Sequence, residues 1–252
     1  FSKPYGAILV TGPTGSGKTT TLYSALKAIA NREINVTTIE DPIEMVIEDF
    51  NQTSVQSKVG IDFARALRHI LRQDPDVIMV GEIRDGDTAQ YAIQAALTGH
   101  LVFSTLHTND AASSISRLVD LGVERFLISS TLIGTMAQRL VRRICPHCTG
   151  ERYLSNEEAA TLRLTVPAGK RIKVQEGRGC FECRGTGYLG RTGIFEILAV
   201  DDAIKALILE GADAPAIKRE AAKNGMRTLR QSALRKLAEG LTTFEEVVRV
   251  TG

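Results

Sequence analysis

The sequence predicts an α/β protein built around a doubly wound parallel sheet, and three observations support this class. Over residues 6–143, short runs rich in β-branched residues alternate with amphipathic segments at helical spacing. A glycine-rich loop at 12–19 joins the first run to the first helical segment. Acidic residues follow two later runs, and the carboxyl ends of parallel strands are where such sheets bind ligands.

Each element follows from its residues. Buried strands are predicted for the runs at 7–10, 36–39, 77–80 and 101–104. Helices are predicted where apolar side chains recur every three or four residues, as at Leu22, Leu26 and Ile29 and again at Phe63, Leu67, Ile70 and Leu71. Gly99 and Gly122 each follow a further helical stretch, at a position suited to ending a helix.

Beyond residue 143 the pattern changes. Both periodicities fade between Cys145 and Cys183, where two cysteine pairs bracket a polar insert. Residues 191–198 then predict one strand, and the tail predicts four short helices. We therefore expect three parts: a nucleotide-binding domain at 1–143, a cysteine module at 144–188 and a mainly helical subdomain at 189–252.

The composition restricts the classes of protein to which the chain could belong. Of the 252 residues, 43% are hydrophobic and 24% charged, which is typical of a globular chain. No apolar run reaches the roughly 18–20 residues of a membrane span, so the visible part is expected to be soluble, and the first residue, Phe1, suggests a fragment. A net charge of +2 and the absence of tryptophan argue against a nucleic-acid binder, although Arg139, Arg142 and Arg143 form a local basic cluster.

Residues 12–19 match the phosphate-loop pattern at every fixed position, with a strand before the loop and a helix after it. Glycines let the backbone N–H groups turn toward phosphates, and the helix N-terminus favours negative charge. Lys18 is expected to reach the β- and γ-phosphates, and the Thr19 hydroxyl to bind Mg²⁺. The nucleotide-binding residues predicted here are Gly12, Pro13, Thr14, Gly15, Ser16, Gly17, Lys18, Thr19 and Thr20.

Carboxylates follow the second and third strands. Glu40, Asp41 and Glu44 lie on both sides of a turn at a proline. Without a phosphate loop nearby, such a segment would be interpreted as a charged surface turn, and that remains the alternative. Glu82 ends the third strand, with Gly81 where an aspartate is usual in ATP-hydrolysing strands. We expect Glu82 to activate water, while the Glu40–Asp41 pair supports the metal shell.

Two histidines flank the fourth strand. His107 lies at its end, close to the expected phosphates, where an imidazole could sense the γ-phosphate. His100 lies at its start. A packing or surface role is the alternative for both, and it is favoured for His100.

The four cysteines form two C-x-x-C pairs 31 residues apart, a spacing typical of zinc sites. Cys145, Cys148, Cys180 and Cys183 could complete a closed tetrahedron, which would make the site structural. Gly185 and Gly187 suit a tight turn after the second pair. Free thiols are the alternative.

Four segments together closely resemble the secretion ATPase superfamily: residues 12–19, 37–44, 72–85 and 98–110 match its Walker A loop, acidic box, atypical Walker B and histidine box. The cysteine pairs resemble the module of type II secretion and type IV pilus-assembly ATPases, and residues 116–123 and 137–142 look nearer the secretion member. The resemblance implies a RecA-like motor that hydrolyses Mg-ATP in a hexameric ring at the cytoplasmic face of the inner membrane. It also places Lys18, Glu40, Glu44, Glu82 and His107 around the nucleotide.

The family's role implies pseudopilus assembly for protein secretion, with membrane-platform partners reached through N-terminal domains that this sequence does not include. Type IV pilus assembly is the alternative within the family, and a nucleic-acid-dependent ATPase or a non-hydrolysing scaffold lies outside it. In a ring, an arginine can reach a neighbour's γ-phosphate. Arg84, Arg117 and Arg139 are candidates, each of which could equally form an ion pair within its own domain.

Overall fold

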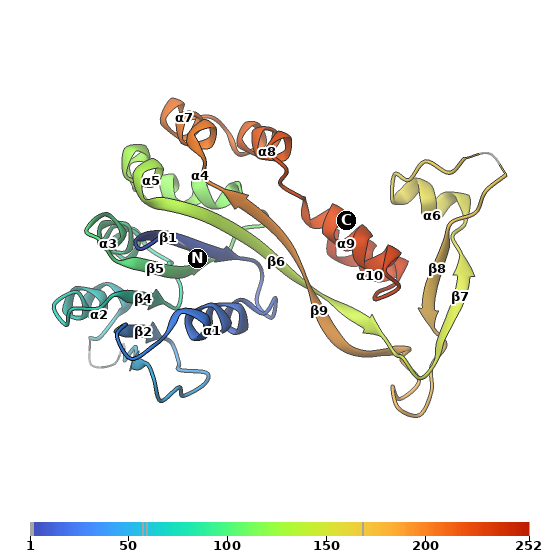
Figure 1. Ribbon diagram of the computed structural model, residues 1–252, viewed down its shortest axis with the longest axis horizontal. Coiled ribbons are helices and arrows are strands. Elements are labelled where there is room, and N and C mark those ends of the chain that lie inside the picture. Colours follow the sequence, from blue (N-terminus) through green and yellow to red (C-terminus); the bar gives the residue numbers. More distant parts are fainter. Residues whose placement is uncertain (1–2, 57, 59, 168, 252) are drawn as a thin grey trace. The chain divides into compact units, whose positions relative to one another are not determined.

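The computed structural model describes residues 3–56, 58, 60–167 and 169–251, and the chain divides into two compact units (Figure 1). Unit 1 comprises Phe1–Ala137 and Ile197–Met226, and unit 2 comprises Gln138–Glu196 and Arg227–Gly252.

A seven-stranded sheet has the order β3-β2-β4-β5-β1-β6-β9. Its strands are β1 (Gly6–Thr11), β2 (Val36–Glu40), β3 (Asn51–Ser54), β4 (Val77–Val80), β5 (Leu101–Leu106), β6 (Leu132–Ile144) and β9 (Tyr188–Ala199). The first six strands pair in parallel. A chain that starts at a central strand and runs to both edges confirms the predicted doubly wound class.

Helices cover both faces of this sheet in unit 1. Figure 1 shows α1 (Lys18–Ile29) on one side of β1, β5, β4 and β2, with α2 (Phe63–Ile70), α3 (Gly86–Leu97) and α5 (Arg125–Thr131) on the other. Leu22, Tyr23 and Leu26 of α1 are buried against β-branched and aromatic side chains of the sheet. This core fixes α1, and therefore the loop before it, against the carboxyl ends of the strands.

Local signals set the helix ends. The Asp62 and Asp85 side chains accept hydrogen bonds from the backbone N–H groups of Arg65 and Thr88, and so cap α2 and α3. Gly99 and Gly122 adopt φ values of +107° and +88° just after α3 and α4 (Ser113–Asp120), which confirms them as helix-ending residues.

The C-terminal helices do not form one subdomain. α7 (Asp202–Glu210) and α8 (Ala214–Lys223) belong to unit 1, whereas α9 (Leu229–Ala238) and α10 (Phe244–Thr251) belong to unit 2. The predicted boundaries at 143/144 and 188/189 also differ from the observed division, which falls inside the long strands β6 and β9. The predicted segments are contiguous in sequence, but each unit is assembled from two separate stretches.

Unit 2 contains regular structure that the sequence did not predict. β7 (Thr149–Tyr153) and β8 (Lys173–Gly177) pair antiparallel, and α6 (Asn156–Thr161) starts at a capping box formed by Ser155 and Glu158. These elements are short and polar, so they carry almost no periodicity. Across the described parts of the chain, no helix has the length and apolar character needed to cross a membrane.

Candidate nucleotide pocket and cysteine site

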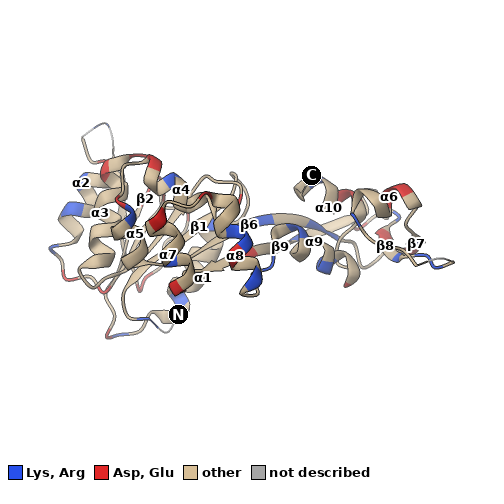
Figure 2. Ribbon diagram, turned by 90° about the horizontal axis from the view of Figure 1, so that it is seen from above, with Lys and Arg blue, Asp and Glu red and all other residues tan. Residues whose placement is uncertain are grey.

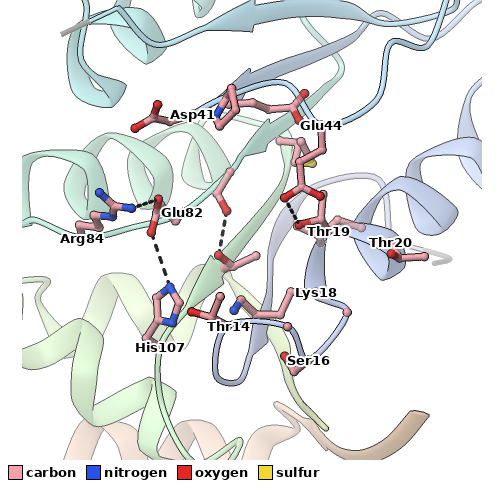
Figure 3. Close-up of a pocket in the computed structure, with 18 of the residues that line it drawn as sticks. Thr14, Ser16, Lys18, Thr19, Thr20, Asp41, Glu44, Glu82, Arg84 and His107 are labelled. Atoms are coloured by element: carbon pink, nitrogen blue, oxygen red, sulfur yellow. Dashed lines mark hydrogen bonds and ion pairs between the residues drawn. The ribbon is translucent and has the colours of Figure 1, made fainter. Parts of the chain in front are cut away.

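The phosphate loop lies between β1 and α1 with its backbone open to the pocket (Figure 3). Gly15 and Gly17 have φ values of +75° and +86°, which residues with a Cβ rarely adopt. Gly17 immediately precedes α1, so the first N–H groups of the helix lie at the loop. The Lys18 Nζ donates to the carbonyls of Gly12 and Pro13 at 2.9 and 3.2 Å. The Lys18 ammonium therefore lies against the carbonyl groups of the loop that is expected to bind the phosphates.

The first turn of α1 contacts residues 40–50, the acidic segment that runs from the last residue of β2 to the start of β3. The Thr19 hydroxyl donates to Glu44 Oε1 at 3.2 Å, and Asp41 is exposed and lines the same pocket. Glu40 differs, because the residue is only 3% exposed and both of its carboxylate oxygens accept hydrogen bonds from neighbouring side chains. A hydroxyl beside an accessible carboxylate supplies oxygen ligands of the kind that Mg²⁺ prefers.

Glu82 lies just beyond β4, facing two cationic or ionisable groups. Arg84 Nη2 lies 2.6 Å from Glu82 Oε1, and His107 Nε2 lies 3.6 Å from Oε2. The hydrogen bond and charge of Glu82 raise the pKa of Arg84. The Thr105 hydroxyl donates to the Gly81 carbonyl at 2.7 Å and the Ile83 N–H to the Thr105 carbonyl at 3.0 Å, which fixes the segment against β5.

Strand geometry separates the histidines as expected. His107 directly follows β5 and lines the pocket. His100 precedes β5, and its Nδ1 lies 2.9 Å from the Ala95 carbonyl. That contact gives His100 a local structural partner at the strand's other end.

These groups enclose a cavity of about 340 Å³, within the range of small-molecule sites. Phe63, Thr105 and Arg84 also line its wall. The sequence pattern did not indicate Phe63 or Thr105 there, and it indicated Arg84 only as a candidate for reaching a neighbouring subunit. Phe63 carried only a core signal, as the first apolar residue of its helix. Of the predicted site residues, the cavity wall brings together Thr14, Gly15, Ser16, Gly17, Lys18, Thr19, Thr20, Glu40, Asp41, Glu44, Glu82 and His107.

The four cysteines of unit 2 meet in one cluster. Their sulfur atoms all lie within 4.8 Å of one another, and Cys145–Cys180, Cys148–Cys183 and Cys180–Cys183 are separated by 3.8, 3.8 and 3.7 Å. A tetrahedron with Zn–S bonds of about 2.3 Å has sulfur–sulfur edges of about 3.8 Å. The donor set and its spacing fit a structural zinc ion.

Backbone groups support the sulfurs. The N–H groups of Gly179 and Gly187 donate to Cys148 and Cys183 at 3.3 and 3.2 Å. Burial raises the pKa of Cys183, but hydrogen bonds from the backbone N–H groups of Cys180 and Gly187 and from the thiols of Cys180 and Cys148 together outweigh it and lower that pKa to about 6. The backbone segments on either side of the second cysteine pair also approach each other closely, since a Cβ on Gly187 would lie 2.4 Å from the Gly177 carbonyl oxygen.

A parallel sheet with a phosphate loop at its carboxyl edge, facing carboxylates on the next strands, defines a P-loop nucleotide-binding protein of the α/β class. Residues 1–249 match the family described as Type II/IV secretion system protein, so the chain belongs to that family.

Relatives within the family carry two kinds of name. The chain is 54% identical over its whole length to the Type IV pilus assembly ATPase PilB of Thermus thermophilus, of which it covers 28%. It is 52% identical over its whole length to the Type II secretion system protein E of Klebsiella pneumoniae, of which it covers 50%. The chain thus spans half or less of these relatives.

A solved structure supports the fold. The pilus retraction motor PilT with bound ADP matches 99% of this chain and 62% of its own, at 33% identity and a TM-score of 0.69.

Proposed function

We propose that this chain is the ATP-hydrolysing part of a ring motor that powers pseudopilus assembly for type II secretion. The observation that carries the proposal is the pocket in which the phosphate loop faces Glu44, Glu82 and His107. Relatives at 52–54% identity bear both secretion and pilus-assembly names, so type IV pilus assembly is the alternative within the same family.

In this proposal Lys18 moves from the loop carbonyls to the β- and γ-phosphates. Thr19, with Glu44 beside it and Asp41 elsewhere in the same cavity wall, would hold Mg²⁺, which neutralises phosphate charge when bound. Water attacks the γ-phosphorus as the bond to the β-phosphate oxygen breaks, and Glu82 accepts the water proton. His107 and Arg84 contact Glu82 and would orient that carboxylate.

The remaining parts of the proposal concern assembly. A homo-hexameric ring would let one site act on the next, with Arg84, Arg117 or Arg139 as candidates for contact across subunits. Partners would be membrane-platform proteins reached through further domains, at the cytoplasmic side of the inner membrane with peripheral attachment. Zinc would stabilise the cysteine module without entering the chemistry.

Mg-ATP hydrolysis per chain, measured against protein concentration, tests the motor. We expect a rate per chain that rises with concentration, because ring sites are completed between subunits. Glu82→Gln should lower the rate by about 10²–10⁴-fold while nucleotide still binds. Glu33→Gln, at an exposed position outside the pocket wall, is the matched control. A Glu82→Gln chain that hydrolyses ATP at the wild-type rate would contradict the assigned base.

The uneven distribution of charge between the two units is a reason to repeat this assay with added nucleic acid. Unit 2 carries sixteen lysines and arginines against nine acidic residues, whereas unit 1 carries fifteen against twenty (Figure 2). The near-neutral net charge of the whole chain therefore hides a basic unit. Stimulation of hydrolysis by DNA or RNA would favour the nucleic-acid-dependent alternative, and an unchanged rate would favour the secretion motor.

A further inference from the structure

The acidic segment after β2 is attached to α1 at two successive turns. Thr19 donates to Glu44, and Tyr23, four residues later on the same helix face, donates to Glu40. We propose that Tyr23 and Gln52 are positioning residues for the Mg-nucleotide site, which act by holding the acidic segment so that Glu44 stays beside Thr19. The inference rests on the proposed function and adds two residues to it.

Glu40 is the buried centre of this arrangement. Its Oε1 accepts hydrogen bonds from the Thr38 hydroxyl at 2.6 Å and from Gln52 Nε2 at 3.0 Å, and its Oε2 accepts the bond from the Tyr23 hydroxyl. Three protein donors thus surround a carboxylate that is almost wholly buried, which is how proteins stabilise such a group. These contacts assign Glu40 to holding the segment, and leave the metal-side carboxylate to Glu44.

Gln52 of β3 connects that centre to the segment itself. Its Nε2 donates to the Met45 carbonyl at 3.0 Å, and its Oε1 accepts from the Ile47 N–H at 2.7 Å. The same Nε2 lies 3.2 Å from the Tyr23 hydroxyl oxygen. The Gln52 amide therefore forms hydrogen bonds to the backbone of residues 45 and 47, which follow Glu44 closely in the chain.

Tyr23 is rigidly placed to transmit this constraint. Its side chain is 3% exposed, and its ring is parallel to that of Phe50 with centroids 6.5 Å apart. Burial, followed by the hydrogen bond and charge of Glu40, raises the pKa of the phenol, so the hydroxyl remains a donor at any physiological pH. Phe50 ends the segment that Glu40 begins, so Tyr23 contacts both of its ends.

The test measures binding of a fluorescent ATP analogue to the chain as Mg²⁺ is titrated in and, separately, with EDTA. Tyr23→Phe and Gln52→Met should each raise the Mg²⁺ concentration for half-maximal binding by about two- to tenfold. Metal-free binding, which depends on the phosphate loop, should stay unchanged. Tyr91→Phe and Gln90→Met on α3, outside the pocket wall, are the matched controls.

A second comparison asks whether the effect passes through Glu44. In a Glu44→Gln background, Tyr23→Phe should add less than about a twofold further change, because the group it positions is already altered. An equal loss with and without Mg²⁺, full additivity with Glu44→Gln, or no effect of either variant would overturn the inference. A wild-type chain that binds no nucleotide would instead overturn the proposed function.

Discussion

The two units hold their sites in different ways. The pocket of unit 1 joins the ends of three strands to the start of a helix, and a continuous apolar core fixes all of these elements. The cysteine cluster of unit 2 lies on two short turns, and the backbone segments on either side of the second turn approach each other closely at Gly177 and Gly187. The first site is therefore expected to survive many single changes, whereas the second is expected to depend on the proposed zinc ion and on a few backbone atoms.

The largest effect should come from breaking the proposed zinc site. Cys148→Ser removes one of the four sulfur atoms that could bind the ion, and binding of structural zinc contributes about 10–16 kcal/mol in zinc-finger peptides. We expect loss of zinc, measured as metal per chain by mass spectrometry, and rapid protease cleavage within unit 2. Nucleotide binding should change less than about twofold, because the pocket draws all its residues from unit 1. Retained zinc and wild-type protease resistance would contradict the structural role of the ion.

The second-largest effect compares two glycine substitutions, one that changes only the backbone conformation and one that also brings a Cβ too close to another backbone segment. Gly185 and Gly187 share a φ of +75°. A Cβ added at Gly185 would have no neighbouring atom within 4 Å, whereas a Cβ added at Gly187 would lie 2.4 Å from the Gly177 carbonyl oxygen. Gly185→Ala should cost about 1–2 kcal/mol of unfolding free energy from its conformation alone. Gly187→Ala should cost at least about 1–3 kcal/mol more, because backbone must move. Equal losses in denaturant unfolding of the zinc-bound chain would show that the close approach is unimportant.

A third effect concerns the buried carboxylate of Glu246 in unit 2. Burial raises its pKa, but hydrogen bonds from Arg249 and from the backbone and side chain of Arg142 outweigh burial and lower it to about 2. The unfolded value is near 4.5, so this stabilisation is complete above pH 4.5 and is lost as the pH falls through 2.

Denaturant unfolding of the wild-type chain and Glu246→Gln at pH 6 and pH 3 measures this effect. At pH 6 the substitution should cost about 1–3 kcal/mol, since it removes a charged acceptor from two arginines. The difference between the chains should shrink at pH 3. Glu157→Gln, in the first turn of α6, is the control, and a pH-independent difference would contradict the assignment.

The sequence predicted the phosphate loop and the four central strands of unit 1 because these elements carry strong local signals, whereas β3 and β6 were not predicted. Buried strands such as 77–80 are continuous apolar runs, and the phosphate loop and Glu82 follow strands directly, so their shared edge could be inferred from topology alone. The grouping of the four cysteines was likewise predicted from spacing, and the sulfur positions agree with it.

What the sequence did not predict depends on distant partners. β3 and β7 are polar, and pairing with a neighbouring strand is what makes them strands. Glu40 was expected beside the metal because its position at a strand end is visible, whereas its donors Tyr23 and Gln52 lie 17 and 12 residues away. The spacing of Tyr23 from Thr19 was the one signal that could have indicated the contact.

The smallest effect tests the glycine that replaces the usual aspartate. The Gly81 N–H donates to the Ile39 carbonyl at 2.8 Å, and a Cβ would lie 3.1 Å from the same oxygen and 3.6 Å from the Phe63 ring. The φ of Gly81 is outside the left-handed region, so Gly81→Ala needs only a shift of a few tenths of an ångström. We expect a loss of about 1 kcal/mol or less of unfolding free energy, well below that of Gly187→Ala. A larger side chain should cost more, because it must displace either the end of β2 or Phe63. Glycine at this position is thus explained by the close approach of β4 to β2, and a loss as large as that of Gly187→Ala would show that the two sites tolerate crowding equally poorly.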